Sequence, residues 1–484
     1  MKVLFAVSEC VPFAKSGGLA DVAGALPKEL VKQGIDLRVI MPKYGSIEND
    51  LKSQMIKKAE FTIEVGWRNQ YCGIEELEYQ GVLYYFVDNE YYFMREELYG
   101  YFDDGERFAY FNRTVLELLP RINFQPDIIH CHDWHTGMIP FLLKMEYKQK
   151  QGYESIQTVF TIHNLLFQGI MPSESLKELF GLQEKYFHID YLEFYGCISY
   201  MKGAIVAADK ITTVSPTYKN EIQTSAYGER LHELLQSRAH DLEGILNGID
   251  TEVYNPENDP FLFQYFSRKE LINKQVNKLH LQNLVGLPKK VNVPIIAMVT
   301  RLTKQKGIDL IRHVFGKLMA EDVQLIILGS GDEEFERFFQ QMESAYPQKC
   351  KVSIGFDEGF AHQIYAGADL FLMPSQFEPC GLGQMIAMKY GTVPIVRETG
   401  GLNDTVLSFN EQSGQGNGFS FTHFNAHDML FTIERALSFY RDKECWSVIV
   451  QNAMAMDFSW AQSAMKYNQL YLELVSRSGM HVYN

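Results

Sequence analysis

The chain has 484 residues, 46% of them hydrophobic and 22% charged, and its 45 Lys and Arg against 60 Asp and Glu give a formal net charge of −15. The apolar content excludes an intrinsically disordered protein, and the negative charge argues against binding to nucleic acid or to an anionic membrane surface. A chain longer than about 250–300 residues outgrows a single hydrophobic core, so at least two domains are expected.

The N-terminal half alternates short apolar runs, typical of buried strands, with segments of helical spacing. The runs span residues 2–7, 36–41, 81–87, 127–131, 158–162 and 210–214. Helical patterns occupy residues 19–30, 107–119 and 138–147. This alternation predicts a parallel sheet with helices on both faces.

The C-terminal half repeats this pattern. Its apolar runs span residues 294–299, 323–328, 351–355, 370–373 and 393–396, with helical patterns at 307–319 and 381–390. We therefore predict an α/β protein with two doubly wound, Rossmann-like domains that face a central cleft.

A polar stretch with Gly and Pro at residues 247–259 is the predicted hinge between the domains. It divides the chain into an N-terminal domain, 1–245, and a C-terminal domain, 246–457. The segment 458–484 contains an amphipathic helix, which either crosses back to the N-terminal domain or forms the last layer of the second.

The cysteines and the N-terminus bear on the compartment. Seven cysteines, an odd number without a close CxxC pair, argue against a disulfide framework or a zinc knuckle. The apolar run at 2–7 is too short for a signal peptide, and no run approaches the roughly 20 apolar residues of a membrane span. The sequence therefore predicts a cytoplasmic protein without a membrane segment.

Ligands of open parallel sheets bind beyond the carboxyl ends of the strands, so the loops that follow strands are the candidate sites. The first such loop contains Lys15-Ser-Gly-Gly and leads into a helix that begins near Gly18. Glycines that let the backbone approach a ligand, a helix N-terminus and a lysine together indicate an anion site. A tight strand–helix turn with an exposed lysine is the alternative.

A second cationic loop, Arg301-Leu-Thr-Lys-Gln-Lys-Gly, follows the run at 294–299. Arg301 and Lys306 suit the binding of phosphate oxygens, although a solvated surface loop is the alternative. The glycines of Gly329-Ser-Gly do not form the full dinucleotide fingerprint, so no dinucleotide cofactor is predicted.

Histidines gather at His130-Cys-His-Asp-Trp-His. A metal site would need a fourth convergent ligand, so we predict no metal and expect Asp133 or Trp134 to contact a polyhydroxylated ligand. His163 follows the run at 158–162, where its imidazole either binds a ligand hydroxyl or lies in the core as a structural histidine.

Two more loops follow strands of the second series. Glu378, in Phe-Glu-Pro-Cys-Gly-Leu, is predicted at a helix start, where it either accepts hydrogen bonds from sugar hydroxyls or only stabilises the helix N-terminus. Thr399-Gly400 repeats this arrangement after the run at 393–396. Phe356, just after the run at 351–355, is placed to stack on a base.

Six motifs together resemble the bacterial glycogen synthases and plant starch synthases, in the order of that family and over nearly the whole chain. They are Lys15-Ser-Gly-Gly-Leu, His132-Asp-Trp-His-Thr-Gly, Thr161-Ile-His-Asn, Asn247-Gly-Ile-Asp, Arg301-Leu-Thr-Lys-Gln-Lys-Gly and Phe377-Glu-Pro-Cys-Gly-Leu. The resemblance implies a GT-B type glycosyltransferase, a hexosyltransferase that moves glucose from ADP-glucose to the non-reducing end of an α-1,4-glucan such as glycogen. It further implies retention of the anomeric configuration and no metal or cofactor.

The resemblance also implies roles for single residues. The N-terminal domain would serve the glucan acceptor and the C-terminal domain the nucleotide sugar. The implied catalytic residues are Glu378 and His163 beside the glucose, and Arg301 and Lys306 at the diphosphate. The implied substrate-binding residues are Lys15, Gly18, Asp21, Asp133, Asn247, Phe356, Gly381, Leu382, Thr399 and Gly400. Phe356 replaces a tyrosine common in relatives, which keeps the stacking ring and removes its hydroxyl.

Three alternatives remain open from the sequence. A UDP-glucose-dependent glucosyltransferase or a nucleotide-sugar epimerase would keep the fold and change the reaction. A non-catalytic glucan-binding protein would keep the fold alone. The oligomeric state is not indicated by the sequence.

Overall fold

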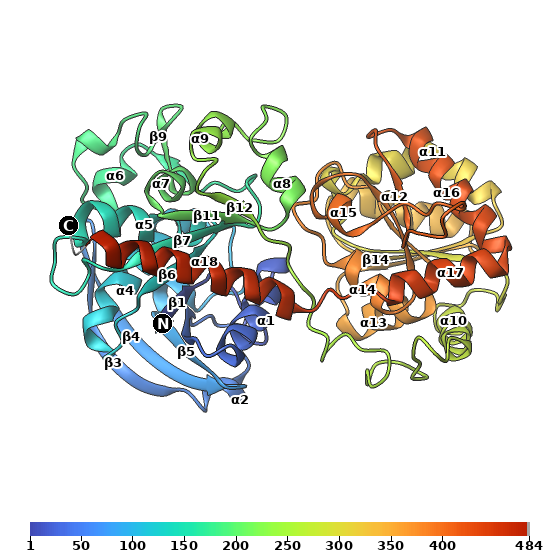
Figure 1. Ribbon diagram of the computed structural model, residues 1–484, viewed down its shortest axis with the longest axis horizontal. Helices are drawn as coiled ribbons and strands as arrows, with labels where there is room; N and C mark the ends of the chain where they lie inside the picture. The colour runs from blue at the N-terminus through green and yellow to red at the C-terminus, as the bar shows by residue number, and fades with distance from the viewer. Residues whose placement is uncertain (482–484) are drawn as a thin grey trace. The chain divides into compact units, whose positions relative to one another are not determined.

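A computed structural model describes residues 1–481 of the chain. The chain forms two compact units, which we call the N-terminal unit, Met1–Gly248 together with the helix that begins at Trp460, and the C-terminal unit, Ile249–Ser459. Each unit is built on its own sheet (Figure 1). None of the helices within residues 1–481 combines the length and apolar character needed to cross a bilayer.

The N-terminal unit contains a nine-stranded sheet with the order β12-β11-β7-β6-β1-β2-β5-β4-β3. Its strands are β1 (Lys2–Ala6), β2 (Asp36–Pro42), β3 (Ile56–Val65), β4 (Arg68–Tyr79), β5 (Val82–Asp88), β6 (Ile128–His132), β7 (Gln157–Ile162), β11 (Lys210–Thr213) and β12 (Leu242–Gly244). A small sheet contains β8 (Ile170–Pro172), β9 (Glu193–Phe194) and β10 (Cys197–Ser199). All pairs from β12 to β5 are parallel, so the carboxyl ends of β1, β6 and β7 lie side by side at one edge.

The hairpin formed by β3 and β4 was not predicted. Its strands pair antiparallel at the edge of the sheet, and most side chains of β3 are at least partly exposed. A strand that faces water carries polar residues, here Lys57, Lys58 and Glu60, and lacks the continuous apolar run of a central parallel strand. The sequence signal for this hairpin is therefore weaker than for the rest of the sheet.

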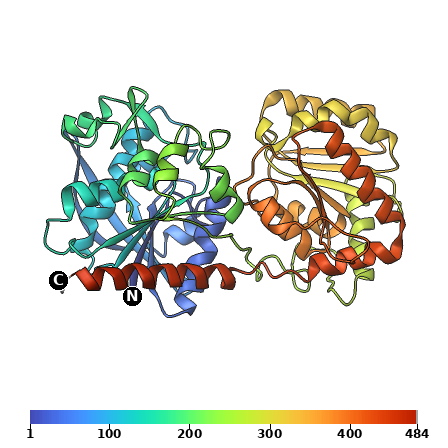
Figure 2. The ribbon, with the colours of Figure 1, turned by 45° about the horizontal axis from the view of Figure 1, so that its top comes forward.

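The helices of the N-terminal unit cover this sheet (Figures 1 and 2). They are α1 (Gly18–Lys32), α2 (Asn49–Lys52), α3 (Glu90–Phe93), α4 (Asp104–Leu118), α5 (Met138–Leu142), α6 (Ser175–Glu178), α7 (Tyr200–Ala207), α8 (Pro216–Glu221), α9 (His232–Ser237) and α18 (Trp460–His481), with the short 3₁₀ helices η1 (Leu119–Arg121), η2 (Trp134–Thr136) and η4 (Glu184–Tyr186) and the π-helix η3 (Leu143–Tyr147). The last helix, α18, packs against α1, and Asn468 donates a hydrogen bond to Gln33 (3.1 Å). The C-terminal segment of the chain therefore belongs to the N-terminal unit.

The C-terminal unit contains a six-stranded, fully parallel sheet with the order β15-β14-β13-β16-β17-β18. Its strands are β13 (Ile295–Val299), β14 (Gln324–Gly329), β15 (Cys350–Ile354), β16 (Leu370–Met373), β17 (Val393–Arg397) and β18 (Phe419–Phe421). Its helices are α10 (Ile272–Leu284), α11 (Ile308–Ala320), α12 (Glu333–Ala345), α13 (Glu358–Gly367), α14 (Gly383–Lys389), α15 (Gly400–Thr405), α16 (Ala426–Arg441) and α17 (Lys443–Met454), with the turn η5 (Lys304–Lys306).

The core of the C-terminal unit lies against both faces of its sheet. Figures 1 and 2 show α11, α12 and α16 on one face and α10, α13 and α14 on the other. The larger apolar cluster joins strand residues such as Ile296 and Leu325 to Ile311 of α11 and Ile433 of α16, all fully buried. The predicted α/β class with two doubly wound domains is confirmed.

Candidate active site

The loop after β1 brings together the first three predicted site residues. Lys15 lies just before α1, and its ammonium is 2.8 Å from the carboxylate of Asp21 in the first turn of that helix. Gly18 is the first residue of α1 and is exposed. Both charged side chains remain partly exposed, at 32% for Lys15 and 27% for Asp21, so a ligand can reach them.

Glu9, in the same loop, is a residue that the sequence did not predict at the site. Its carboxylate accepts a hydrogen bond from the backbone N–H of Ser16 (2.5 Å), and its side chain lies close to Gly17. Burial raises the pKa of the Glu9 carboxyl, and Asp21 acts in the same direction. No motif marks a single glutamate beside a strand end, so only the structure identifies it as the residue that shapes the Lys15 loop.

Asp133 and His163 join the loops after β6 and β7. Asp133 has a φ of +55°, and its carboxylate accepts hydrogen bonds from the backbone N–H groups of His163 (2.8 Å) and Asn164 (3.4 Å). Burial raises the pKa of the Asp133 carboxyl to about 7, against the lowering effect of these two hydrogen bonds. The two residues are thus neighbours at the edge of the sheet, as their positions after adjacent strands predict.

The imidazole of His163 is paired with another histidine. His132 Nδ1 and His163 Nε2 are 2.9 Å apart. Burial lowers the pKa of His163 to about 3 and the pKa of His132 well below its usual value, so both rings are neutral and share one proton in this contact. The other nitrogen of His132, Nε2, is buried and has no hydrogen-bond partner among the described residues.

This pairing determines which proton His163 carries. An N–H without an acceptor is rare in protein interiors, so we place the proton of His132 on Nδ1, from where it donates to His163 Nε2. A neutral His163 then carries its own proton on Nδ1. The ring is partly exposed and therefore offers an N–H donor to a ligand oxygen.

The other histidines of the 130–135 segment are structural. His130 is fully buried between the hydroxyl of Tyr471 in α18 (2.6 Å) and that of Thr161 in β7 (2.6 Å). His135 is buried against the ring of Trp134, which is itself only 8% exposed. Across residues 1–481, no group of three or more His, Cys, Asp or Glu side chains is arranged to hold a metal ion.

Asn247 lies at the same edge of the N-terminal unit, shortly after β12. It is 6% exposed, and its side-chain Oδ1 has no hydrogen-bond partner among the described residues. A buried amide oxygen without a donor costs free energy, which a ligand hydroxyl can recover.

In the C-terminal unit, Lys306 and Glu378 form an ion pair. The two residues follow the adjacent strands β13 and β16, and Lys306 Nζ lies 2.6 Å from Glu378 Oε2. The hydroxyl of Ser375 donates to the same oxygen (2.9 Å). The Glu378 side chain is 8% exposed and that of Lys306 is 15% exposed, so the pair is largely withdrawn from water.

Two glycines allow the loops around Glu378 to pack this closely. Gly400 has a φ of +45°, and a Cβ there would lie 1.9 Å from the Glu378 carbonyl oxygen. Gly307, with a φ of +74°, would place a Cβ 2.0 Å from the carbonyl oxygen of Pro374. Thr399 directly precedes α15, so the loops after β13, β16 and β17 meet around Glu378.

The predicted helix start at Glu378 is wrong. Gly381 has a φ of +73°, a left-handed conformation that is incompatible with a right-handed helix at this residue. The helix α14 therefore begins only at Gly383. Leu382 precedes that helix and is partly buried. Glu378 is therefore held by the Lys306 ammonium and the Ser375 hydroxyl, and not by a helix N-terminus.

Arg301 and Phe356 are exposed at the carboxyl ends of β13 and β15. Phe356 is 65% exposed and directly precedes Asp357, the residue that caps α13. The strand order puts both residues at the same edge as Glu378, separated by β14. The structure thus gathers the predicted residues of each unit at one edge of that unit's sheet.

Comparisons with known proteins agree with the motifs. Residues 2–237 match the starch synthase catalytic domain family, and residues 283–447 match the group 1 glycosyl transferases. The chain is 63% identical over 483 residues to a glycogen synthase of Anoxybacillus flavithermus, covering 100% of both chains. It is 64% identical over 477 residues to a glycogen synthase of Geobacillus thermodenitrificans, covering 99% of this chain and 98% of that one.

Two solved structures are similar over almost the whole chain. The catalytic domain of starch synthase IV from Arabidopsis thaliana, bound to ADP and acarbose, is 36% identical with a TM-score of 0.91, covering 98% of this chain and 99% of that one. A sucrose-phosphate synthase from Thermosynechococcus elongatus has a TM-score of 0.62 at 17% identity, covering 98% of this chain and 99% of that one, which shows a shared fold.

Proposed function

The chain belongs to the family of bacterial glycogen synthases and plant starch synthases, and we propose that it moves glucose from ADP-glucose to the non-reducing end of an α-1,4-glucan, elongating glycogen. It is a glycosyltransferase with a GT-B type fold, as the motifs predicted. The observation that carries the proposal is the 63% identity to a glycogen synthase over 100% of both chains.

The charged cluster of the C-terminal unit suits the departure of a nucleoside diphosphate. Breaking the bond between glucose and ADP leaves negative charge on the diphosphate, and fixed cations stabilise that charge more in the transition state than in the ground state. We assign this role to Arg301 and Lys306. The ADP bound in the Arabidopsis relative supports the assignment.

We assign the donor glucose to Glu378 and His163. Glu378 Oε2 already accepts hydrogen bonds from Lys306 and Ser375, which leaves Oε1 as the acceptor for sugar hydroxyls. His163 supplies its Nδ1–H as a donor to a sugar oxygen. Gly381, Leu382, Thr399 and Gly400 lie in the loops around Glu378 and are assigned to the sugar and its phosphate.

The remaining assignments follow the resemblance. Lys15, Gly18, Asp21, Asp133 and Asn247 are proposed to contact the substrates from the N-terminal unit, and Phe356 to stack on the adenine. The exposed ring of Phe356 supports that role.

We propose retention through attack of the acceptor hydroxyl on the same face from which ADP leaves, with the departing phosphate accepting its proton. The two donors on Glu378 Oε2 support this route, because hydrogen bonds to a carboxylate make it a weaker nucleophile. A covalent glucosyl–Glu378 intermediate is the alternative.

We place this reaction in the cytoplasm. All seven cysteines are free thiols, five of them buried, which suits a reducing compartment.

The test separates the donors. The full-length protein is incubated with ADP-glucose or UDP-glucose, with and without glycogen, and the released nucleotide is measured. Glycogen-dependent ADP release, with new linkages cleaved by an α-1,4-specific glucosidase, is the expected result. Release of UDP alone would identify a UDP-glucose-dependent enzyme, and glycogen binding without release of either nucleotide would contradict an enzymatic function.

A further inference from the structure

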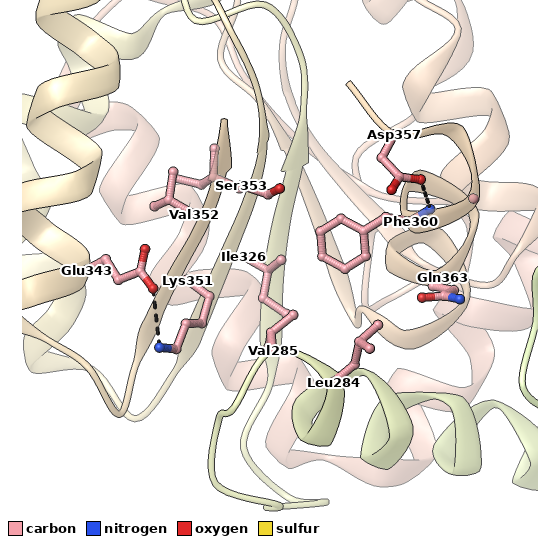
Figure 3. A pocket seen from close by; sticks show the side chains of 12 residues that line it. Leu284, Val285, Ile326, Glu343, Lys351, Val352, Ser353, Asp357, Phe360 and Gln363 are labelled. Atoms are coloured by element: carbon pink, nitrogen blue, oxygen red, sulfur yellow. Dashed lines mark hydrogen bonds and ion pairs between the residues drawn. The ribbon is translucent and has the colours of Figure 1, made fainter. Parts of the chain in front are cut away.

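Two cavities of the C-terminal unit lie away from the predicted donor residues, and they differ in charge. One, of about 510 Å³, lies between the end of α10, β15 and the start of α13 (Figure 3). Its only cation, Lys351, is paired with Glu343 (3.2 Å), and its third charged residue, Asp357, caps α13 by accepting the N–H of Phe360. This cavity therefore offers no unbalanced positive charge.

The other cavity, of about 450 Å³, lies at the opposite edge of the sheet from Glu378. Its lining includes residues that precede β13, β16 and β17, together with residues of α10, α16 and α17. In a parallel sheet, positions before the strands and positions after them are separated by the strand length, about 16 Å for the five residues of β13. A ligand here is thus distinct from one held by Arg301, Lys306 and Glu378.

Four charged residues line this second cavity, namely Lys274, Lys278, Lys443 and Asp369. Lys278 is 3% exposed, and its ammonium contacts the Asp369 carboxylate (2.7 Å), the Tyr440 hydroxyl (2.8 Å) and the Val291 carbonyl (2.9 Å). The same carboxylate oxygen also accepts the backbone N–H of Ile295 (2.8 Å). The single carboxylate of the cavity is therefore already committed to one lysine and one amide.

The other two lysines have no carboxylate of their own in the cavity. Lys274 donates to neutral acceptors, the Ala366 carbonyl (2.9 Å) and the Thr392 hydroxyl (2.8 Å). The ammonium of Lys443 lies 4.0 Å from the centre of the Tyr440 ring. Burial lowers the pKa of Lys274 to about 7 and also lowers that of Lys443, with the charge of Lys278 acting in the same direction on both.

A structural role explains only part of this arrangement. Lys274 binds carbonyls at the C-terminus of α13, which is a common position for a lysine. That role accounts for neither Lys443 nor the cavity beside it. The nearby Asp442 is directed to the backbone of α17, where it accepts the N–H groups of Glu444 and Cys445, and it is not among the lining residues.

We propose that this cavity is a second binding site, which takes the phosphate group of a small phosphorylated molecule between Lys274 and Lys443, while the buried Lys278 contributes its charge and no direct contact. With Lys274 protonated, three ammonium groups against one carboxylate leave two positive charges, which match the charge of a phosphate dianion; a bound anion favours that protonation, and lysine binds phosphate as a point charge. The volume exceeds that of a phosphate group, and Tyr440 and Trp446 supply apolar surface for the rest of the ligand. The site is independent of the proposed reaction.

The test titrates inorganic phosphate into the full-length protein by calorimetry. All proteins carry Arg301→Ala, which weakens phosphate binding at the proposed donor site. Saturable binding in the low millimolar range or tighter is expected, weakened at least tenfold by Lys443→Gln or Lys274→Met and unchanged by the control Lys317→Gln. Lys443 and Lys317 are both exposed helix residues of the same unit, so they match in charge and in tolerance to substitution.

Absence of binding, or equal binding with and without the Lys443→Gln and Lys274→Met substitutions, would overturn the proposal. Glycerol 3-phosphate, titrated in parallel, distinguishes the source of the phosphate group. Tighter binding than inorganic phosphate assigns the cavity to a phosphate ester, and equal binding assigns it to free phosphate. Thermal unfolding of each variant verifies that a loss of binding reflects the site and not unfolding.

Discussion

The two units place their predicted functional residues at equivalent edges of their sheets, yet they use opposite electrostatics. In the N-terminal unit the edge groups are neutral or easily neutralised: two histidines with lowered pKa values, and two carboxyls, Glu9 and Asp133, with raised ones. In the C-terminal unit the largely buried pair is ionic, Lys306 with Glu378, and Arg301 lies exposed nearby.

The source of the difference is what each carboxylate contacts. Glu9 and Asp133 accept hydrogen bonds from backbone N–H groups, which do not offset the cost of burial, whereas Glu378 contacts an ammonium group and a hydroxyl. The first arrangement suits uncharged sugar hydroxyls. The second, together with Arg301, combines a carboxylate that can accept sugar hydroxyls with cations that suit the charge of a diphosphate. The position at a strand end alone therefore does not determine the chemistry.

The largest effect is expected from Glu378→Gln. The substitution leaves Lys306 without its counter-charge and exchanges a carboxylate acceptor for an amide, so turnover should fall at least about 100-fold, or about 2.7 kcal/mol. Nucleotide release with ADP-glucose and glycogen measures it. Glu343→Gln is the matched control, because Glu343 also pairs with a lysine of the same unit but in the cavity of Figure 3. Equal activity of the two variants would contradict a special role for Glu378.

The second-largest effect is expected from Asp133→Asn, which tests whether burial raises the pKa of the Asp133 carboxyl. In the folded protein Asp133 keeps its proton up to about pH 7, while in the unfolded chain it loses it near pH 4. The folded state thus binds more protons between these values, and wild-type stability falls as the pH rises from 4 to 7.

Asparagine cannot ionise and keeps an oxygen for the His163 N–H. Between pH 5 and pH 8 the free energy of unfolding of the variant should therefore improve by about 2 kcal/mol relative to the wild type. Urea unfolding at the two pH values measures this change. A constant difference between the two proteins would show that Asp133 ionises normally.

The eleven strands that were predicted agree with the structure to within one or two residues at each end. The short strands β8, β9, β10, β12 and β18 were not predicted, because two or three residues give no recognisable apolar run. β13 and β16 are continuous apolar runs because helices bury both of their faces, and that pattern is visible in one dimension. β3 and β4 were missed because an exposed edge hairpin has no such run. The helix α14 was predicted to begin too early, because a glycine in the left-handed conformation cannot be distinguished from a helical one by spacing.

The candidate site was predictable where a motif marks it and not elsewhere. The Lys15 loop, His163, the Arg301 loop and Glu378 all stand in recognisable strings after apolar runs. Glu9 stands in none, and the choice between a ligand-binding and a structural His130 depends on Tyr471, which is 341 residues away in sequence. This contact depends on the packing of α18 against the N-terminal unit. The sequence did not decide whether that helix belongs to the N-terminal or to the C-terminal domain.

A third, smaller effect is expected from replacing one exposed cation in each unit. Lys15→Ala and Arg301→Ala should each lower glucan elongation at least tenfold, or about 1.4 kcal/mol, if each cation contributes to binding the nucleotide sugar. Initial rates over a range of ADP-glucose concentrations measure the effect, with Lys317→Ala as a control for the loss of one exposed positive charge. Unchanged turnover in either variant would remove that residue from the site.

The smallest effect should come from Tyr471→Phe, which tests whether the neutral histidine cluster depends on α18. Tyr471 is fully buried, and its hydroxyl lies 2.6 Å from His130 Nδ1. Removing the hydroxyl keeps the ring and its packing but leaves one buried imidazole nitrogen without a partner, which should cost about 1 kcal/mol of stability. Urea unfolding measures this loss.

The activity of the folded Tyr471→Phe variant should change by less than twofold, since His163 is paired through His132 and not through His130. A much larger loss of activity would mean that the two histidine contacts act as one network. In that case the packing of α18 would influence the proton position at His163, and the neutral edge of the N-terminal unit would depend on the C-terminus of the chain as well as on its own strand ends.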